Sequence, residues 1–231
     1  MSVGAKIYTK INRPDPALVA RFADKPVANI NDVIGRNNCL GSKLHRYNST
    51  ELIGTAFTIK APIGEGMLMH YALDIAQAGD VIIFDAGGCE ERAMCGEGMM
   101  LFARQKGIKG FIVNGAIRDS EAAMQFDDFG IWALGANPNA QRQANAGCIN
   151  VPISIGGVVI YPGDIVRGDA DGIVVIRPDE AAQIIDKLDE FAAKDREKMR
   201  CSADGTVDRT WVQKFFEGKP FEVIDGTWDG Q

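Results

Sequence analysis

The sequence predicts an α/β fold, because short apolar runs alternate with segments of helical periodicity in the first part of the chain. Nearly all-apolar runs are typical of strands covered on both faces of a sheet. Strands that alternate with helices form parallel sheets with crossover connections. Short β-rich segments separated by Gly, Pro and Asp follow, and a long amphipathic helical pattern comes last. The alternating strands are expected at residues 81–84, 110–113 and 131–134.

The other predicted elements follow from turn signals and apolar spacing. Residues 15–35 contain two short helical patterns that Pro26 separates. Residues 52–61 form a β-branched and aromatic run that ends at Pro62, as a strand would. Further helices are expected at residues 67–78, from about 93 or 97 to 106, near 120–126, from 178 to about 199, and at 211–216. Further short strands are expected at residues 151–155, 157–160 and 173–176.

Composition predicts a protein without nucleic-acid or membrane partners. The chain has 231 residues and no repeat or low-complexity segment, so we expect a single domain over residues 1–231. Its net charge of -6 disfavours a phosphate-binding groove, although a small anionic substrate responds to the local field. No apolar run approaches the roughly 20 residues that span a bilayer. The five cysteines include no C-x-x-C pair, which favours reduced thiols and a cytoplasmic location.

One ten-residue segment carries the strongest functional signal. It starts with the apolar run Gly110-Phe-Ile-Val113, after which Asn114-Gly115 is expected to end the strand and Arg118-Asp119 to precede a helix. Ligands of α/β sheets bind beyond the carboxyl ends of the strands, which is where this sequence places both charged side chains. Arg pairs with carboxylate or carbonyl oxygens, and Asp ligates hard cations. A structural Arg–Asp pair that caps the helix explains these residues alone equally well.

A second segment, Asp85-Ala-Gly-Gly-Cys-Glu-Glu-Arg92, is expected between a strand and a helix. Its glycines allow positive φ, and the amides that follow would converge at the positive end of the helix, which suits an anion. A tight turn that needs glycine explains the same residues as well. Cys89 has no partner base in the sequence, which argues against a reactive thiol.

Other candidate residues favour structural roles. Asp169-Ala-Asp171-Gly172 starts like a calcium loop, but a strand follows it and the required glutamate is missing, which favours a hairpin turn. His45 and His70 have no carboxylate or cysteine at metal-ligand spacing. His70 lies in an apolar helical pattern, which favours a packed residue over a catalytic base.

In their order along the chain, these segments resemble the RraA-like family, and within it the 4-hydroxy-4-methyl-2-oxoglutarate / 4-carboxy-4-hydroxy-2-oxoadipate aldolase branch. The resemblance implies a layered α/β/β domain, similar to swivelling domains. Its core would span about residues 27–178, and a C-terminal helical arm about 179–217. The matching segments are DVIIFDAGG at 80–88, AMCGE at 93–97, GFIVNGAIRD at 110–119, PISIGG at 152–157, PGD at 162–164 and GDADGIVV at 168–175.

The resemblance further implies a class II, metal-dependent pyruvate aldolase. Enzymes of this branch cleave a 4-hydroxy-2-oxo acid to pyruvate and a second 2-oxo acid, and they decarboxylate oxaloacetate through the same pyruvate enolate. By analogy, Asp119 anchors Mg²⁺ or Mn²⁺, and Arg118 binds the substrate oxygens. The family also implies a closed homotrimer or homohexamer. The substrate carboxylate would be held by the segment that contains Gly88, Cys89, Glu90 and Glu91.

Two alternatives stay open. The namesake of the family is a non-catalytic regulator that binds a ribonuclease, but regulator-type members usually lack the carboxylate that Asp119 supplies. An enzyme on the same scaffold could also act on another oxo or hydroxy acid. Residues 89–92 keep that alternative open, because they depart from the common family pattern and add two negative charges. The family also takes an acidic residue from a neighbouring subunit, for which Asp195 or Glu197 could serve.

Overall fold

The structure is a computed structural model that describes residues 4–142 and 146–228. The chain forms two compact units, Met1–Leu188 and Asp189–Gln231. The first unit contains every strand described below and the candidate site. The second unit contains the larger part of one long helix and one short helix.

Most strands of the first unit form one sheet of nine strands among the described residues. Its four central strands, β3 to β6, are parallel neighbours, and a helix connects each to the next. The predicted alternation of parallel strands and crossover helices is therefore confirmed. The strands of this sheet are β1 (Lys6–Ile7), β2 (His45–Arg46), β3 (Leu52–Lys60), β4 (Asp80–Ala93), β5 (Gly110–Ile117), β6 (Gly130–Ala136), β7 (Cys148–Ile149), β10 (Ile165–Asp169) and β11 (Gly172–Ile176).

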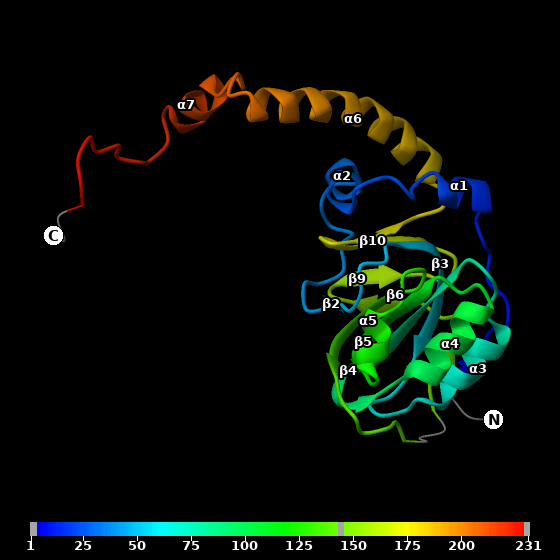
Figure 1. The fold of residues 1–231 in the computed structure, drawn as a ribbon. Coiled ribbons are helices and arrows are strands. Elements are labelled where there is room, and N and C mark those ends of the chain that lie inside the picture. The colour runs from blue at the N-terminus through cyan, green and yellow to red at the C-terminus, as the bar shows by residue number, and fades with distance from the viewer. Residues whose placement is uncertain (1–3, 143–145, 229–231) are drawn as a thin grey trace. The chain divides into compact units, whose positions relative to one another are not determined.

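The central strands lie between two packed layers, because successive side chains along each strand point to opposite faces of the sheet. On one face, Phe84 and Phe111 pack with apolar residues of the helices. On the other face, Ile83 and Ile112 pack with the hairpin of β8 (Ile153–Ile155) and β9 (Val158–Ile160). Figure 1 shows α3 and α4 side by side against the parallel strands. The predicted α/β/β layering is confirmed. The helices of the first unit are α1 (Pro16–Ala20), α2 (Val27–Val33), α3 (Met67–Ile75), α4 (Glu97–Gln105) and α5 (Ser120–Met124).

The C-terminal helices are α6 (Ala181–Ala203) and α7 (Thr210–Phe216). The start of α6 belongs to the first unit, where Ile184 and Leu188 pack in a core cluster with Ile176 of β11. Residues 179–188, which the sequence assigned to the arm, thus lie in the main unit. Within the described residues, no helix has the length and apolar character to cross a bilayer.

Three two-residue strands, β1, β2 and β7, were missing from the sequence prediction, and so was the longer strand β10. It pairs antiparallel with β11 and with β3, and the hairpin turn predicted at Asp169–Gly172 joins β10 to β11. A charged residue, Arg167, interrupts the apolar pattern of this strand. Arg167 is in fact 2% exposed, and its Nη2 donates to Glu51 Oε2 over 2.6 Å. A buried, paired arginine does not interrupt the strand.

Two central strands continue through residues that were expected to form turns. β5 continues through Asn114 and Gly115, because Asn114 Nδ2 donates to Asp85 Oδ1 over 2.8 Å and Gly115 pairs with Cys89. β4 continues past its glycines, with register irregularities on both sides of Cys89. The turn expected at residues 85–92 is therefore a bulged strand, which absorbs the extra residues without leaving the sheet.

Candidate active site

Arg118 and Asp119 directly follow β5, at the carboxyl edge of the parallel strands where the sequence predicted them. Asp119 has a left-handed backbone, with φ 56° and ψ 43°. This conformation is uncommon outside glycine, although Asp tolerates it better than most residues, and it is enriched at functional sites. Asp119 occupies the N-cap position of α5, yet its side chain makes no capping hydrogen bond to that helix.

The carboxylate of Asp119 instead contacts the first residue of α4. Its Oδ2 accepts a hydrogen bond from the Glu97 backbone N–H over 2.9 Å and lies 3.6 Å from Nε of Arg118. The Arg118 and Asp119 side chains remain 48% and 43% exposed, so both can still meet a ligand. Within the described part of the chain, Oδ1 of Asp119 accepts no hydrogen bond. The charged pair therefore joins the end of β5 to the start of α4 and does not cap α5.

Glycine fits position 96 because the charged pair approaches it closely, and not because of its backbone conformation. Its φ of -145° and ψ of -173° are open to any residue. A Cβ atom at this position would lie 2.5 Å from Oδ2 of Asp119 and 2.8 Å from Nε of Arg118. Any larger residue would therefore displace the charged pair. Sequence reasoning did not select Gly96 as a site residue, although its place immediately before a helix was the available signal.

The first turn of α4 presents a backbone amide beside Arg118. Helix starts leave their first N–H groups without intrahelical partners. Asp119 accepts from the amide of Glu97, whereas the Gly98 amide donates to no described residue. Gly98 and Arg118 line the same cavity. Because the helix dipole and these amides favour negative charge, the start of α4 and Arg118 together suit a carboxylate.

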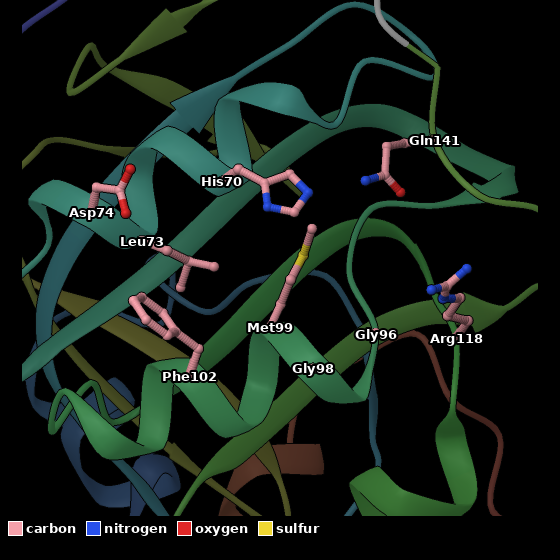
Figure 2. Close-up of a pocket in the computed structure, with 9 residues that line it drawn as sticks. All are labelled: His70, Leu73, Asp74, Gly96, Gly98, Met99, Phe102, Arg118 and Gln141. Carbon is pink, nitrogen blue, oxygen red and sulfur yellow. The ribbon is translucent and has the colours of Figure 1, made fainter.

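The cavity has a volume of about 540 Å³, a size suited to a small metabolite. Figure 2 shows the side chains of His70 and Met99 directed into it, with Arg118 at one end and Asp74 at the other. The cavity thus combines a cationic end, an acidic end and an apolar middle. Its remaining lining residues are Leu73, Gly96, Gly98, Phe102 and Gln141.

His70 and Gln141 are cavity residues that the sequence did not assign to a site. His70 was expected to be packed in the core, but its side chain is exposed and lines the cavity. The expectation is wrong because His70 lies beside the buried positions Met69 and Leu73 on α3 and does not face the sheet with them. Gln141 lies in an irregular segment after β6, where periodicity carries no information.

A second cavity of about 440 Å³ shares Arg118 with the first. Asp119, Glu121 and Asn137 also line it. Asn137 Nδ2 donates to the backbone oxygen of Glu90 over 3.0 Å, which fixes this wall against β4. The Arg118 guanidinium can therefore contact a ligand in either cavity.

The predicted anion site at residues 88–91 has a different geometry from the one expected. These residues belong to β4, whereas α4 begins at Glu97, so their amides do not converge at a helix start. No described residue of 88–91 lines either cavity beside Arg118. Cys89 is buried in the core, and Glu90 and Glu91 are exposed. The substrate-binding role assigned to these residues stays a prediction.

Cysteine chemistry gains no support near the site. Burial and, to a smaller extent, the negative charge of Asp119 raise the pKa of the Cys95 thiol to about 12. The thiol is therefore protonated at neutral pH and is a poor nucleophile. Burial also raises the pKa of Tyr47, as does the charge of Glu90 to a smaller extent.

The residues around Asp119 fit a hard cation that keeps much of its water. Among the described residues, no group of three or more His, Cys, Asp or Glu side chains could hold a metal. Asp119 supplies one half-exposed carboxylate with an unpaired Oδ1. Mg²⁺ is commonly bound by one or two carboxylates together with several waters, so this donor set is sufficient.

The RraA-like family (Aldolase/RraA) matches residues 22–175. This chain belongs to the RraA-like family. It is 34% identical over 198 residues to a protein of Halalkalibacterium halodurans named "Putative 4-hydroxy-4-methyl-2-oxoglutarate aldolase", a match that covers 85% of this chain and 94% of that relative.

Solved structures of RraA-like proteins share the fold. The RNA-processing inhibitor RraA from Thermus thermophilis is 25% identical with a TM-score of 0.61, over 66% of this chain and 93% of its own. RraAS2 of Streptomyces coelicolor, described as an unusual member of the RNase ES inhibitor RraA protein family, is 28% identical with a TM-score of 0.72. That match covers 81% of this chain and 100% of RraAS2. The predicted RraA-like fold is confirmed.

Proposed function

We propose that this RraA-like protein is a divalent-metal-dependent aldolase that cleaves a 4-hydroxy-2-oxo acid to pyruvate and a second 2-oxo acid. Oxaloacetate decarboxylation is its expected second activity. The observation that carries the proposal is the contact of Asp119 with the start of α4. It places the Asp119 carboxylate beside Arg118, which lines both cavities: Arg118 shares the first with Gly98 and the second with Asp119. The relative named as an aldolase supports the same reaction class.

Arg118 and the Gly98 amide bind the 2-oxo acid end of the substrate. The planar guanidinium forms paired hydrogen bonds to a carboxylate, which a lysine cannot reproduce. In the cleavage, the C3–C4 bond breaks, its electron pair goes to C3, and negative charge spreads to the C2 oxygen beside Arg118. The C4 hydroxyl loses its proton and becomes an oxo group, while C3 takes up a proton. The reaction is balanced without an oxidant or reductant.

Asp119 would hold Mg²⁺ or Mn²⁺, directly or through water. When bound, the cation supplies Lewis-acid stabilisation of charge on the oxygens of the 2-oxo acid. The hydrogen bond from Glu97 fixes Oδ2 of Asp119 and leaves Oδ1 for this purpose. The left-handed backbone of Asp119 holds the carboxylate at the end of β5.

A second candidate is a non-catalytic regulator that binds a ribonuclease. The descriptions of the Thermus and Streptomyces proteins support this alternative, since both name inhibition of RNA processing or of an RNase. The complete Arg118–Asp119 pair beside a cavity favours the enzyme. A lyase of the same scaffold that acts on another oxo or hydroxy acid would share the chemistry and differ in substrate.

A pyruvate-release assay tests the proposal. Purified protein is incubated with 4-hydroxy-4-methyl-2-oxoglutarate and, separately, with oxaloacetate, in Mg²⁺, in Mn²⁺, in EDTA, and after excess metal is restored. Oxaloacetate also loses CO₂ spontaneously, so protein-free reactions at each metal concentration are subtracted. We expect metal-dependent release from both substrates, lost in EDTA and recovered with metal. Turnover that persists in EDTA contradicts the mechanism, and failure to turn over any 2-oxo acid shifts support to the regulator.

We also propose that copies of the chain assemble into a homotrimer or homohexamer, as the family resemblance implies. The second unit exposes large apolar side chains that need a partner surface. Light scattering of the full chain at micromolar concentration tests assembly, and a monomer would contradict it. The exposed apolar residues of this unit include Trp211, Phe215, Phe216, Phe221, Val223, Ile224 and Trp228.

A further inference from the structure

The half of the cavity beyond Arg118 has chemistry that pyruvate formation does not use. His70 contributes a polar group there, and Gln141 contributes another polar group to the same cavity. Leu73, Met99 and Phe102 line the same space with apolar groups. A pocket that is mostly apolar with a few directed polar groups selects its ligand by shape and hydrogen bonding. The shape and hydrogen-bonding groups of this half of the cavity should therefore match the part of the substrate that differs between 4-hydroxy-2-oxo acids.

The segment that carries Gln141 is fixed to the start of α3. The Arg142 amide donates to the oxygen of Gly64 over 2.7 Å, and the Gly66 amide donates to the oxygen of Arg142 over 3.3 Å. Gly66 leaves room for this segment, since a Cβ atom there would lie 2.2 Å from Cγ of Gln141. Gln141 and His70 thus have defined positions on neighbouring parts of one cavity wall (Figure 2).

Charge differs sharply between the two ends of the cavity. Arg118 and the α4 amides make one end favourable for a carboxylate, and Asp74 makes the opposite end unfavourable (Figure 2). His70 and Asp74 are four residues apart on α3, so they lie on the same side of that helix, a carboxylate spacing that was overlooked in the sequence. His70 separates the acidic end from the Arg118 end and can donate an N–H group in either protonation state.

We propose that His70 binds the carboxylate of the departing 2-oxo acid and that Asp74 restricts what else that fragment carries. This inference rests on the proposed aldolase function and names the specificity residues of the same site. With the 2-oxo end at Arg118, the C4 carboxylate extends towards His70. A C4 methyl group then contacts the apolar surface of Met99 and Phe102. His70 and Asp74 thus act as specificity residues that favour a departing fragment with one carboxylate and a small apolar group over a fragment with two carboxylates.

Asp74 distinguishes this class from tricarboxylates. In 4-carboxy-4-hydroxy-2-oxoadipate a carboxymethyl group replaces the methyl group, which gives the substrate a third negative charge and the departing fragment a second one. That charge would approach Asp74 in the far half of the cavity and would be repelled. Removing the charge of Asp74 should therefore help the tricarboxylate and leave the methyl-bearing dicarboxylate nearly unchanged.

Oxaloacetate separates binding of the departing fragment from all other steps. Its departing group is CO₂, which does not reach His70, whereas its 2-oxo end binds at Arg118 like that of any other substrate. The experiment measures kcat and KM for three substrates, the methyl-bearing dicarboxylate, the tricarboxylate and oxaloacetate, by chromatographic detection of pyruvate at early times. The variants are His70→Leu, His70→Gln and Asp74→Asn. Asp127→Asn is the control, because that side chain is 93% exposed and lies outside both cavities.

For His70→Leu, we expect kcat/KM for the two aldol substrates to fall by at least about tenfold, while oxaloacetate changes by less than about threefold. His70→Gln should recover part of the loss, since an amide can still donate to a carboxylate. Asp74→Asn should raise kcat/KM for the tricarboxylate by about threefold, an exposed charge having a modest effect. Thermal melts verify that each variant is folded.

The contrary results are distinct. Equal losses on oxaloacetate and on the aldol substrates would show that His70 is structural and would overturn the inference alone. Unchanged kinetics for all three substrates in folded His70→Leu would overturn it as well. If wild-type protein turned over none of the substrates, the proposed function would fail and the inference would fail with it.

Discussion

Two glycine-containing segments at the same edge of the sheet use glycine for different physical reasons. Gly87 and Gly88 of β4 have φ of 63° and 78°, and a Cβ atom at Gly88 would meet nothing within 4 Å. Gly96 has an ordinary extended backbone, but a Cβ atom there would collide with the charged pair. The first segment needs the conformational freedom of glycine and the second needs its small volume. Close approach to Arg118 and Asp119 marks the second segment as part of the site.

Removal of the Asp119 charge should have the largest effect. Asp119→Asn preserves shape and tolerance of the left-handed backbone but removes the anionic ligand for a hard cation. We expect kcat/KM for pyruvate release to fall at least about a hundredfold, equivalent to about 2.7 kcal/mol. Steady-state kinetics with Mg²⁺ in excess provide the measurement. Wild-type turnover in a folded variant would show that the Glu97 contact of Asp119 is purely structural.

Gly96→Ala tests the close-approach glycine directly. The added methyl group must displace Arg118 or Asp119, and small misplacements of reacting groups can cost about a hundredfold in rate. We expect a loss of roughly ten- to a hundredfold in kcat/KM, with an unchanged melting temperature because the backbone at 96 suits alanine. Gly226→Ala is the control, because its new methyl group would make an ordinary contact of 3.7 Å. Wild-type activity of Gly96→Ala would contradict the proposal that the site needs the small volume of glycine at position 96.

Arg118→Lys separates charge from geometry at the same pair. Lysine keeps the positive charge but lacks the planar fork that matches a carboxylate. We expect kcat/KM to fall at least about tenfold, or about 1.4 kcal/mol of transition-state binding. Parallel assays with the aldol substrate and oxaloacetate should show similar losses, because both place a 2-oxo acid here. Unaltered kinetics would assign Arg118 to structure.

Gly88→Ala tests the conformational glycine. Alanine in the left-handed region is strained, so the free energy of unfolding should decrease by about 1 kcal/mol. Denaturant titration measures the change in the free energy of unfolding. Steady-state kinetics on the folded protein measure the change in kcat/KM. If residues 88–91 are structural, kcat/KM stays within about twofold of wild type. A specific loss of activity would instead support their predicted contact with the substrate carboxylate.

At neutral pH, Cys95, beside Gly96, should have the smallest effect of these residues, because its effect on stability arises only at alkaline pH. The folded state raises the thiol pKa from 9.0 to about 12, so between these values the unfolded chain releases a proton that the folded chain keeps. Stability should therefore fall as pH rises through this window. Cys95→Ala should flatten that decline in denaturant titrations at pH 8 to 10.5. If stability fell with pH equally in both proteins, the Cys95 thiol would not be shielded from solvent in the folded state.

Sequence patterns predicted the strands and helices that have strong apolar periodicity. The parallel strands and the position of Arg118 and Asp119 after β5 were found because such periodicity reports burial directly. β10 was missed because the ion pair that allows Arg167 to be buried depends on Glu51, which is remote in the sequence. The extension of β4 was missed because glycine signals a turn and a bulge alike.

The site was predicted less completely than the fold. The pair that follows β5 was identified, but the anion-binding amides were assigned to residues 88–91 and not to the start of α4. The collision that makes Gly96 indispensable involves residues 22 and 23 positions away and leaves no periodic trace. His70 and Gln141 are likewise joined by folding alone. A site is formed by contacts between segments that are far apart in the sequence, and sequence periodicity does not report such contacts.

The crowding at Gly96 also limits which substitutions this site can tolerate singly. A Cβ atom at position 96 would lie 2.5 Å from Oδ2 of Asp119, 2.8 Å from Nε of Arg118 and 2.9 Å from Cγ of Arg118. Truncating Asp119 alone would therefore leave the Arg118 contacts in place. Position 96 can accept a side chain without displacing its neighbours only when both charged residues have changed.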